Sequence, residues 1–455
     1  MPFSPAATNL PVISAFEQCR EDISPNGGLS FVARVLDTLP AMEKWDTAFP
    51  RAVQSRYGTG CIVRAMLGLL CVGHRSFAGI TALGQDSLLK GLVGGAAPSE
   101  ETLRQQIGAL AAKDGWRAIL DECVSQTLAA TPPSRLSVGH MSLVPVDIDV
   151  SVLEDTSSHK EGVCMTYHRV NGYAPIFCYA GTQGYMVANE LRPGSQHSEN
   201  GAVEFLKRCI GILLASGLEA KDLLVRVDSG HDATDFVKAL QDTGVKYIVK
   251  RNLRQKDRQQ IYDNVRSGSD SAERPRSGKW VRRGFVADAP SGMSIDEYKG
   301  FNAVEATRRT ILADGQALLF PQHEADCYWT NLPFGVGTIV ALYHNHATSE
   351  QYHSELKSDM GLELLPCNAF KTNAFVLSLC AVAFNCLRLI GQKAVARAVL
   401  LDGWHRKVSR IRLREVLLDL VKVACKVVAH AGRTVLKFGR NCMVFPVLKE
   451  IYAAI

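Results

Sequence analysis

The sequence has no CxxC pair and no group of His and Cys at the spacing of a zinc site. Its thirteen Cys are scattered along 455 residues, and the first ten residues, MPFSPAATNL, do not read as a secretory signal. The cysteines are therefore expected to be reduced core thiols of a cytoplasmic protein, not disulfides or zinc ligands.

Long apolar runs, internal repeats and low-complexity segments are also missing. The most apolar run, residues 374–390, reaches only the lower limit of about 17 residues for a membrane span and contains Asn385 and Arg388. We expect a buried core helix there and no membrane partner. The chain is too long for one hydrophobic core, so roughly two to four domains are expected.

The basic residues are concentrated in two segments. Residues 246–284 hold twelve Lys and Arg against four Asp and Glu, and residues 403–440 hold ten against two. The net charge of the whole chain is only +6, so the remainder is acidic. Two basic segments on an acidic chain favour a polyanionic partner, most simply nucleic acid, although solvated loops and helix faces give the same composition.

The first third of the chain has the pattern of short helices joined by Gly and Pro turns, over residues 28–125. One of them, PSEETLRQQIGALAAK, begins with Ser99 as the expected N-cap and has two Glu in its first turn. The pattern predicts a helical bundle. Both a helix-turn-helix module and a simple packing domain fit it.

From residue 141 the pattern changes to strands. LVPVDIDVSVLE alternates strictly, with Asp147 and Asp149 on its polar face. Two more strand-like runs follow, then a helix that ends at Gly217, the strand DLLVRVD, a second helix and the strand VKYIVKRN. This order predicts an α/β domain, a mixed sheet covered by helices.

A different texture interrupts this pattern. Residues 253–292 are rich in Arg, Ser, Gly and Gln and are expected to be a mobile loop. Strand-like pieces come next, in VEATRRTILA, QALLFPQ and DCYWTNLP. The sequence therefore predicts a β-rich insertion, after which the α/β pattern resumes at about residue 335.

Three acidic residues stand out from their surroundings. Asp149 lies on the first strand, Asp228 ends the buried strand LLVRVD, and Glu350 lies in a late helix. Taken singly, each also fits an ordinary strand-end or surface carboxylate. Together they suit attack on a phosphodiester, because two Mg²⁺ ions about 3.5–4 Å apart can be held by a few carboxylates.

The helix that carries Glu350 has other ionisable residues on the same face. Lys357 lies two turns after Glu350, and His346 lies one turn before it. A lysine in that position could neutralise a phosphate beside a metal site. Solvent-facing helix charges give the same spacing.

The spacing Tyr343–x2–His346–x3–Glu350–x6–Lys357 resembles the Y-(2)-R-(3)-E-(6)-K signature of bacterial insertion-sequence DDE transposases. The chain looks closest to the branch called transposase DDE domain group 1. Further similar segments are DIDVS, NELRPGSQHS, VRVDSGHD, YWTNLP and ELKSDMG, and the resemblance covers roughly residues 30–440.

The resemblance implies an RNase H-like mixed sheet with flanking helices, interrupted by a β-rich insertion and preceded by a helical N-terminal domain. The domains expected along the chain are a helical DNA-binding domain (1–140), two parts of the catalytic domain (141–252 and 335–400), the insertion (253–334) and a basic C-terminal region (401–455).

The activity implied is that of a Mg²⁺-dependent transposase, with Mn²⁺ able to replace Mg²⁺. It would cut at insertion-sequence ends and join the 3′-OH ends to target DNA. Carried over by position, the catalytic and metal-binding residues are Asp149, Asp228 and Glu350, and Asp147 stays open as the first ligand. Two alternatives remain, namely a nuclease or recombinase of the same fold that no longer transposes, and a non-catalytic DNA-binding repressor.

The implied partner is double-stranded DNA, both the terminal inverted repeats and the target, bound by a homodimer in a synaptic complex. The implied location is the bacterial cytoplasm, at the nucleoid when the protein is bound to DNA. Tyr343 and Lys357 match positions that hold DNA phosphates. His346 stands where the family has Arg, so the contact there is expected to be weaker, or supplied by His344 or a nearby Arg. Ser151 replaces the family Thr, a milder change.

The insertion is also expected to contact DNA. Its candidate residues are Lys279, Trp280, Arg282 and Arg283. The resemblance implies an aromatic side chain that stacks on a base flipped out of the DNA end. Trp280 is preferred for this role over Trp329, because Trp329 fits core packing better.

Overall fold

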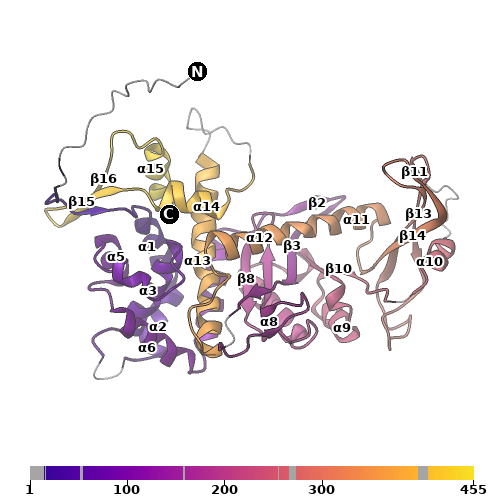
Figure 1. Ribbon diagram of the computed structural model, residues 1–455, viewed down its shortest axis with the longest axis horizontal. Coiled ribbons are helices and arrows are strands. Elements are labelled where there is room, and N and C mark those ends of the chain that lie inside the picture. Colours follow the sequence, from indigo (N-terminus) through magenta and orange to yellow (C-terminus); the bar gives the residue numbers. More distant parts are fainter. Residues whose placement is uncertain are drawn as a thin grey trace, which may run out of the picture.

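The computed structural model describes residues 15, 17–51, 55–156, 159–254, 256–265, 273–397 and 408–455. The N-terminal helices and the C-terminal region lie at one end of an elongated molecule, a mixed sheet lies in the middle, and the insertion projects at the other end (Figure 1).

The N-terminal part is helical, as the sequence pattern predicts. Its helices are α1 (Leu29–Asp37), α2 (Lys44–Ala48), α3 (Thr59–Cys71), α4 (Gly79–Leu83), α5 (Ser87–Val93), α6 (Glu100–Ala111) and α7 (Trp116–Ala130). The predicted cap is confirmed, because the Ser99 side chain accepts a hydrogen bond from the Thr102 backbone N–H at the start of α6.

Strands and helices then alternate in the predicted order. They are β2 (Leu136–Val138), β3 (Met141–Val150), β7 (Ile176–Ala180), β8 (Tyr185–Glu190), α8 (Ala202–Ala215), β9 (Leu223–Val227), α9 (Thr234–Thr243) and β10 (Lys246–Lys250). Between β3 and β7, the short strands β4 (Leu153–Glu154), β5 (Cys164–Met165) and β6 (Asn171–Tyr173) form a small separate sheet.

In the described part of the chain, ten strands form one mixed sheet, in the order β11-β12-β13-β14-β10-β9-β3-β7-β8, with β2 paired to β3. β9 is parallel to both β3 and β10, and β7 is antiparallel to both β3 and β8. Residues 143–148 of β3 are all buried, so the alternating sequence marks a strand that is covered on both faces.

The insertion contains more regular structure than its composition indicates. Its elements are α10 (Arg258–Asn264), β11 (Glu273–Arg276), β12 (Lys279–Val286), β13 (Phe301–Ile311) and β14 (Ala317–Thr330). The expectation of a loop throughout 253–292 is therefore wrong. One charge of β12 finds a partner across the ladder: Arg283 stands opposite Glu305 of β13, and their side chains form an ion pair.

The helical segment after the insertion is uneven. α11 (Val336–His344) passes through a 3₁₀ turn (Asn345–Ala347) into α12 (Thr348–Ser354), and α12 continues into a π-helical turn (Glu355–Asp359). The 3₁₀ turn is overwound and the π turn is underwound relative to an α-helix. The segment runs beside the sheet toward α13 (Phe370–Arg397) (Figure 1).

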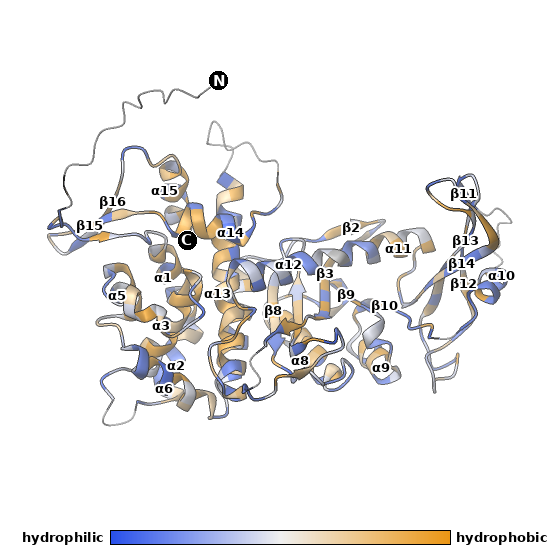
Figure 2. Ribbon diagram, viewed as in Figure 1, coloured by the Kyte–Doolittle hydropathy of each residue, from blue (hydrophilic) through white to orange (hydrophobic). Residues whose placement is uncertain are grey.

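α13 is the centre of the hydrophobic core. Apolar residues of α13, of the N-terminal helices and of the sheet form one continuous buried cluster, and Figure 2 shows α13 and its neighbours α1 and α3 mainly in hydrophobic colours. The Phe375 ring lies 6.1 Å from the Trp45 ring and 4.9 Å from the Trp116 ring, centre to centre. By length and composition α13 could cross a membrane, but 94% of its most apolar window is buried inside the protein. The predicted core helix is confirmed.

The two polar residues of the apolar run both have partners. Asn385 exchanges two 2.8 Å hydrogen bonds with the backbone of Met186 in β8, the last strand of the sheet. Arg388 forms a 2.8 Å ion pair with the buried Glu355 of the π turn. These contacts join α13 to the sheet edge and to the helix that carries Glu350.

The basic C-terminal region is folded over residues 408–455. It contains α14 (Leu413–Val416), β15 (Cys425–His430), β16 (Arg433–Phe438) and α15 (Phe445–Ala454). β15 pairs with β1 (Ile23–Ser24), so the end of the chain returns to its beginning.

Candidate active site

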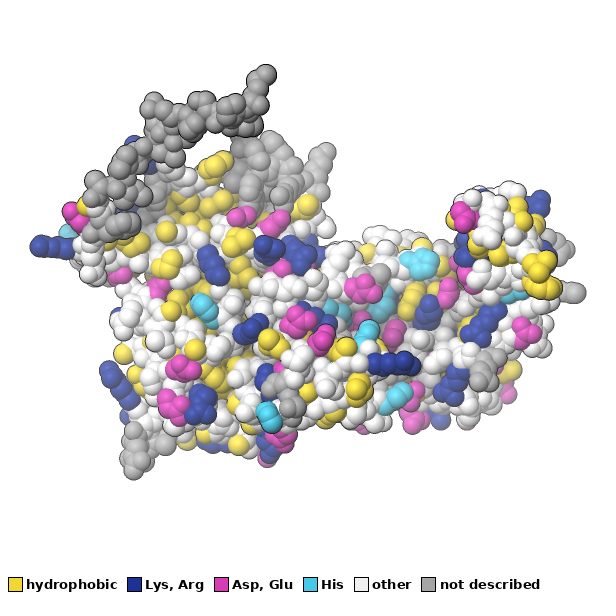
Figure 3. All heavy atoms as spheres, viewed as in Figure 1, with side chains coloured by type: hydrophobic (Ala, Val, Ile, Leu, Met, Phe, Trp, Pro, Cys, Tyr) yellow, Lys and Arg dark blue, Asp and Glu magenta, His cyan; other side chains and the backbone are white. Residues whose placement is uncertain are grey.

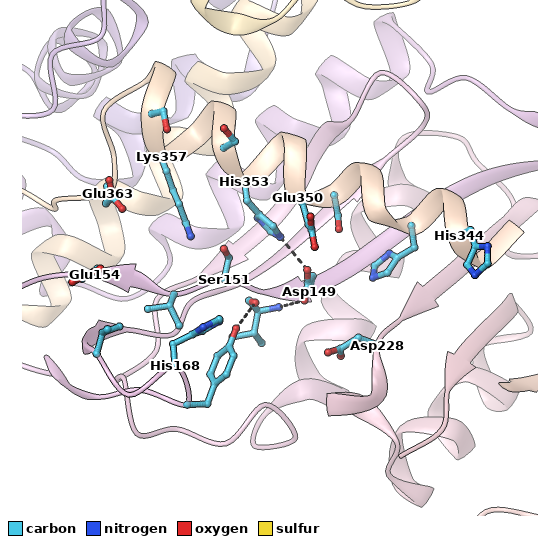
Figure 4. Close-up of a pocket in the computed structure, with 18 of the residues that line it drawn as sticks. Asp149, Ser151, Glu154, His168, Asp228, His344, Glu350, His353, Lys357 and Glu363 are labelled. Carbon is cyan, nitrogen blue, oxygen red and sulfur yellow. Dashed lines mark hydrogen bonds and ion pairs between the residues drawn. The ribbon is translucent and has the colours of Figure 1, made fainter. Parts of the chain in front are cut away.

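A cavity of about 930 Å³ opens between the end of β3 and α12 (Figure 4). Six residues predicted from the sequence line it: Asp149, Asp228, Tyr343, His346, Glu350 and Lys357. The structure thus brings together side chains that are up to 208 positions apart in the chain. In Figure 3, His side chains and acidic side chains gather near the middle of the face shown.

Strand topology explains why two of the acids meet. Asp149 lies one residue before the end of β3, and Asp228 directly follows β9, the parallel neighbour of β3. Carboxyl ends of neighbouring parallel strands meet at one edge of a sheet, where α/β proteins bind ligands. Glu350 is exposed on α12 and points into the same cavity (Figure 4).

Asp147 is buried, and its carboxylate is bound by two protein side chains. It stands opposite Arg226 on β9, whose Nε and Nη2 atoms each lie 2.7 Å from one of its carboxylate oxygens. His346 Nδ1 lies 2.9 Å from the same carboxylate. Burial raises the pKa of Asp147, but the charges and hydrogen bonds of Arg226 and His346 outweigh it and leave the pKa below its usual value. Both carboxylate oxygens of Asp147 therefore face protein partners.

The same network fixes His346. Its ring is buried, and although burial lowers its pKa, the hydrogen bond and the charge of Asp147 leave the pKa raised. Arg226 also donates a 2.7 Å hydrogen bond to the Leu342 carbonyl at the end of α11. Asp147, Arg226 and His346 therefore attach the helix that carries Glu350 to the strands that carry the other two acids.

Asp149 has looser contacts than Asp147. One carboxylate oxygen accepts a 2.8 Å hydrogen bond from the Val150 N–H, and the other lies 3.4 Å from His353 Nε2. His353 Nδ1 lies 3.3 Å from the Tyr179 hydroxyl. His353 was not predicted from the sequence. Its position three residues after Glu350, on the same helical face, was the available signal.

Asp228 is held by the turn that follows its strand. It accepts a 3.0 Å hydrogen bond from the Gly230 N–H and lies 3.0 Å from Nδ1 of the buried His231. Burial raises the pKa of Asp228, but the hydrogen bonds and charge of these neighbours leave it lowered. The carboxylate is about half exposed, so it remains open to the cavity.

Tyr343 and Lys357 also line the cavity. Tyr343 is nearly buried, with its ring 4.9 Å from that of Tyr328, and burial raises the pKa of its hydroxyl. Burial lowers the pKa of Lys357, and the acids Glu363 and Asp149 partly oppose this effect. Figure 4 shows the Lys357 side chain extending down toward the floor of the cavity.

The four candidates of the insertion, Lys279, Trp280, Arg282 and Arg283, do not line the cavity. They all lie on β12. Arg283 forms ion pairs with Glu273 and Glu305, and Arg282 donates to the Tyr262 carbonyl.

The two candidate tryptophans differ in burial. Trp280 is partly exposed, with the guanidinium groups of Arg274 and Arg308 5.0 and 5.1 Å from its ring. Trp329 is buried and donates a 2.8 Å hydrogen bond to Asp232, with Arg251 stacked on it. Trp329 thus has the packing expected of a core residue.

The carboxylates that face the cavity provide the hard oxygen ligands that Mg²⁺ and Mn²⁺ prefer. Within the described residues, however, no three His, Cys, Asp or Glu lie close enough together to hold a metal ion as they stand. Asp149, Asp228 and Glu350 are the residues that would supply these oxygens. Glu350 is exposed, so its rotamer can change without disturbing the core.

Comparisons with known proteins place the chain in a family. A solved structure, the cryo-EM structure of a piggyBac transposase synaptic complex with hairpin DNA, is similar to it at 11% sequence identity and a TM-score of 0.42, covering 86% of this chain and 78% of that chain. No curated protein matches the chain. The family model "Transposase DDE domain group 1" matches residues 17–455. The chain belongs to the transposase DDE domain group 1 family.

Proposed function

We propose that the protein is a DNA transposase that cuts DNA at the ends of an insertion sequence and joins the 3′-OH ends to target DNA. The observation that carries this proposal is the single cavity lined by Asp149, Asp228 and Glu350 in a chain of this family. The order β8-β7-β3-β9-β10 supports the RNase H-like sheet that the resemblance implies. Double-stranded DNA is the proposed partner, and a homodimer the proposed synaptic form.

Asp149, Asp228 and Glu350 are the residues that would hold Mg²⁺. When bound, divalent ions would activate the attacking oxygen and stabilise the leaving oxygen of the phosphodiester. Asp147 is not proposed as a ligand, because Arg226 and His346 occupy its oxygens.

The protein's own residues would position the DNA. Lys357, on the same wall of the cavity as Glu350, adds positive charge where a phosphate would lie. His353 would keep the Asp149 carboxylate in one orientation through its 3.4 Å contact. The Asp147–Arg226–His346 network would hold the distance between α12 and the strands.

The test uses DNA that flanks the gene of this protein, incubated with and without Mg²⁺, with any cuts mapped to the nucleotide. Cuts at the element ends that need Mg²⁺ are expected. The Glu350→Ala variant should bind these ends and leave them uncut. A variant that still excised a marked element at the normal rate would rule out this site.

A further inference from the structure

One wall of the cavity comes from a hairpin that neither the family signature nor the proposed chemistry uses. β5 and β6 are joined by a short turn, and Tyr167 and His168 of that turn line the cavity with Asp149 and Asp228. Figure 4 shows His168 across the cavity from Glu350 and His353. The acids thus face a pair of aromatic rings.

The turn holds these rings in a defined place. The Arg169 N–H donates to the Thr166 carbonyl, and the Thr166 N–H donates to the Val170 carbonyl, both at 2.9 Å. Arg169 has a φ of 61°, in the left-handed region that closes a three-residue hairpin loop. A residue other than Gly is uncommon in this region.

Tyr167 is anchored at one end and open along its ring. Its hydroxyl donates a 3.1 Å hydrogen bond to the Val150 carbonyl, next to Asp149, while 62% of the residue is exposed. The His168 ring lies 4.4 Å away, centre to centre. Partial burial and the carboxylates of Asp149 and Asp228 raise the pKa of Tyr167 to about 12.

An exposed, oriented ring beside a phosphodiester site has an evident use. The base attached to the reacting nucleotide must lie next to its phosphate, and aromatic side chains bind bases of any sequence by stacking. The exposure of Tyr167 also argues against a packing role, because the ring covers little of the core.

We infer that Tyr167 and His168 form a base-stacking platform that holds a nucleotide next to the phosphate to be cut. This inference rests on the proposed function and adds a nucleobase contact to it. The contact is independent of base identity, so the platform would orient the strand for cleavage and leave recognition of the end sequence to other surfaces.

The experiment measures binding and single-turnover cleavage of the element-end duplex in Mg²⁺ by the full-length protein. Tyr167→Ala should weaken binding or raise KM roughly tenfold, the loss expected for one stacked base. Tyr167→Phe keeps the ring and should stay close to wild type. Tyr452→Ala, which removes a similarly exposed tyrosine from α15, is the matched control and should change nothing.

A structural role is separated from stacking by removing the base instead of the ring. A set of duplexes, each with a single abasic site at one position around the cut, is tested with the wild type. One of them should reduce binding or cleavage by the wild type by the same factor as Tyr167→Ala does on the intact duplex. The same duplex should cause no further loss of binding or cleavage in Tyr167→Ala. Additive losses at every position, or an unaffected Tyr167→Ala, would overturn the platform while leaving the proposed function intact. Absence of any wild-type binding or cleavage would overturn both.

Discussion

The middle and the outer end of the large sheet hold their charges in different ways. On β3 and β9, Asp147 and Arg226 are buried together and pair through two 2.7 Å contacts. On β12 and β13, Arg283 and Glu305 also pair, but Arg283 is about one third exposed and shared with Glu273. The pair in the middle is shielded from water, whereas the pair at the outer end is partly solvated.

This contrast is tested most strongly at Asp149. Asp149→Asn keeps the size of the side chain but removes a charged ligand, so cleavage should fall by at least about 10³-fold, because several kcal/mol of metal-based stabilisation disappears. The measurement is single-turnover cleavage in Mg²⁺, with circular dichroism to check the fold. Asp314→Asn, in the exposed turn between β13 and β14, is the control and should keep wild-type cleavage. Equal losses in both variants would contradict the assignment of Asp149.

The free energy of unfolding should also distinguish the middle of the sheet from its outer end. Arg226→Met leaves Asp147 buried with only His346 as its partner, and the free energy of unfolding should fall by about 3–5 kcal/mol. Arg283→Met should cost less than about 1 kcal/mol, because that pair is partly solvated. Urea denaturation measures both values.

The double variant Asp147→Leu with Arg226→Met should recover part of the loss, since no unpaired charge remains buried between the strands. Comparable losses in the free energy of unfolding for Arg226→Met and Arg283→Met would show that the middle and the outer end of the sheet do not differ.

The role of the outer end of the sheet is tested by the salt dependence of DNA binding. Neutralising Lys279, Arg282 and Arg283 to Gln should flatten the dependence of DNA binding on salt, by about one in log–log slope for each phosphate that the variant no longer binds. Arg283 already has two acidic partners, so its share should be the smallest. Lys221→Gln is the control, because Lys221 precedes β9 and lies at the opposite end of that strand from Asp228. An unchanged slope in the triple variant would remove β12 from the DNA path.

The smallest effect is expected at Trp280. Two guanidinium groups already lie near its ring, so a stacked base would compete with them, and Trp280→Ala should weaken binding less than about tenfold. Titration with element-end duplexes of wild type, Trp280→Ala and Trp280→Phe would measure this, and the Phe variant should keep most of the affinity. A larger loss than that of Tyr167→Ala would make the insertion the main stacking surface.

Local patterns were sufficient for much of the fold. Alternation in LVPVDIDV predicted β3, and the Ser99 cap predicted the start of α6, because both depend on neighbours in the chain. The loop expected at 253–292 was wrong for the opposite reason. The arginines of β12 look like solvated charge until Glu305, 22 positions later, is placed opposite one of them.

The site shows the same limit. The strand pattern and the family resemblance selected Asp149, Asp228 and Glu350, and all three line one cavity. They could not decide between Asp147 and Asp149, since both lie on the polar side of one strand. The distinction depends on Arg226, which is 79 positions from Asp147 along the chain and adjacent to it across the sheet. Tyr167 was not predicted from the sequence, because the exposure of one side chain beside a cavity produces no periodic sequence pattern.

The position of α13 limits how this protein can be divided. One helix is covered by the N-terminal helices on one side and is hydrogen-bonded to β8 through Asn385 on another. A fragment without residues 29–130 would expose the apolar face of α13 to water. Such a fragment should aggregate and be inactive. The N-terminal helices and the sheet therefore share one core through α13 and should fold as one unit.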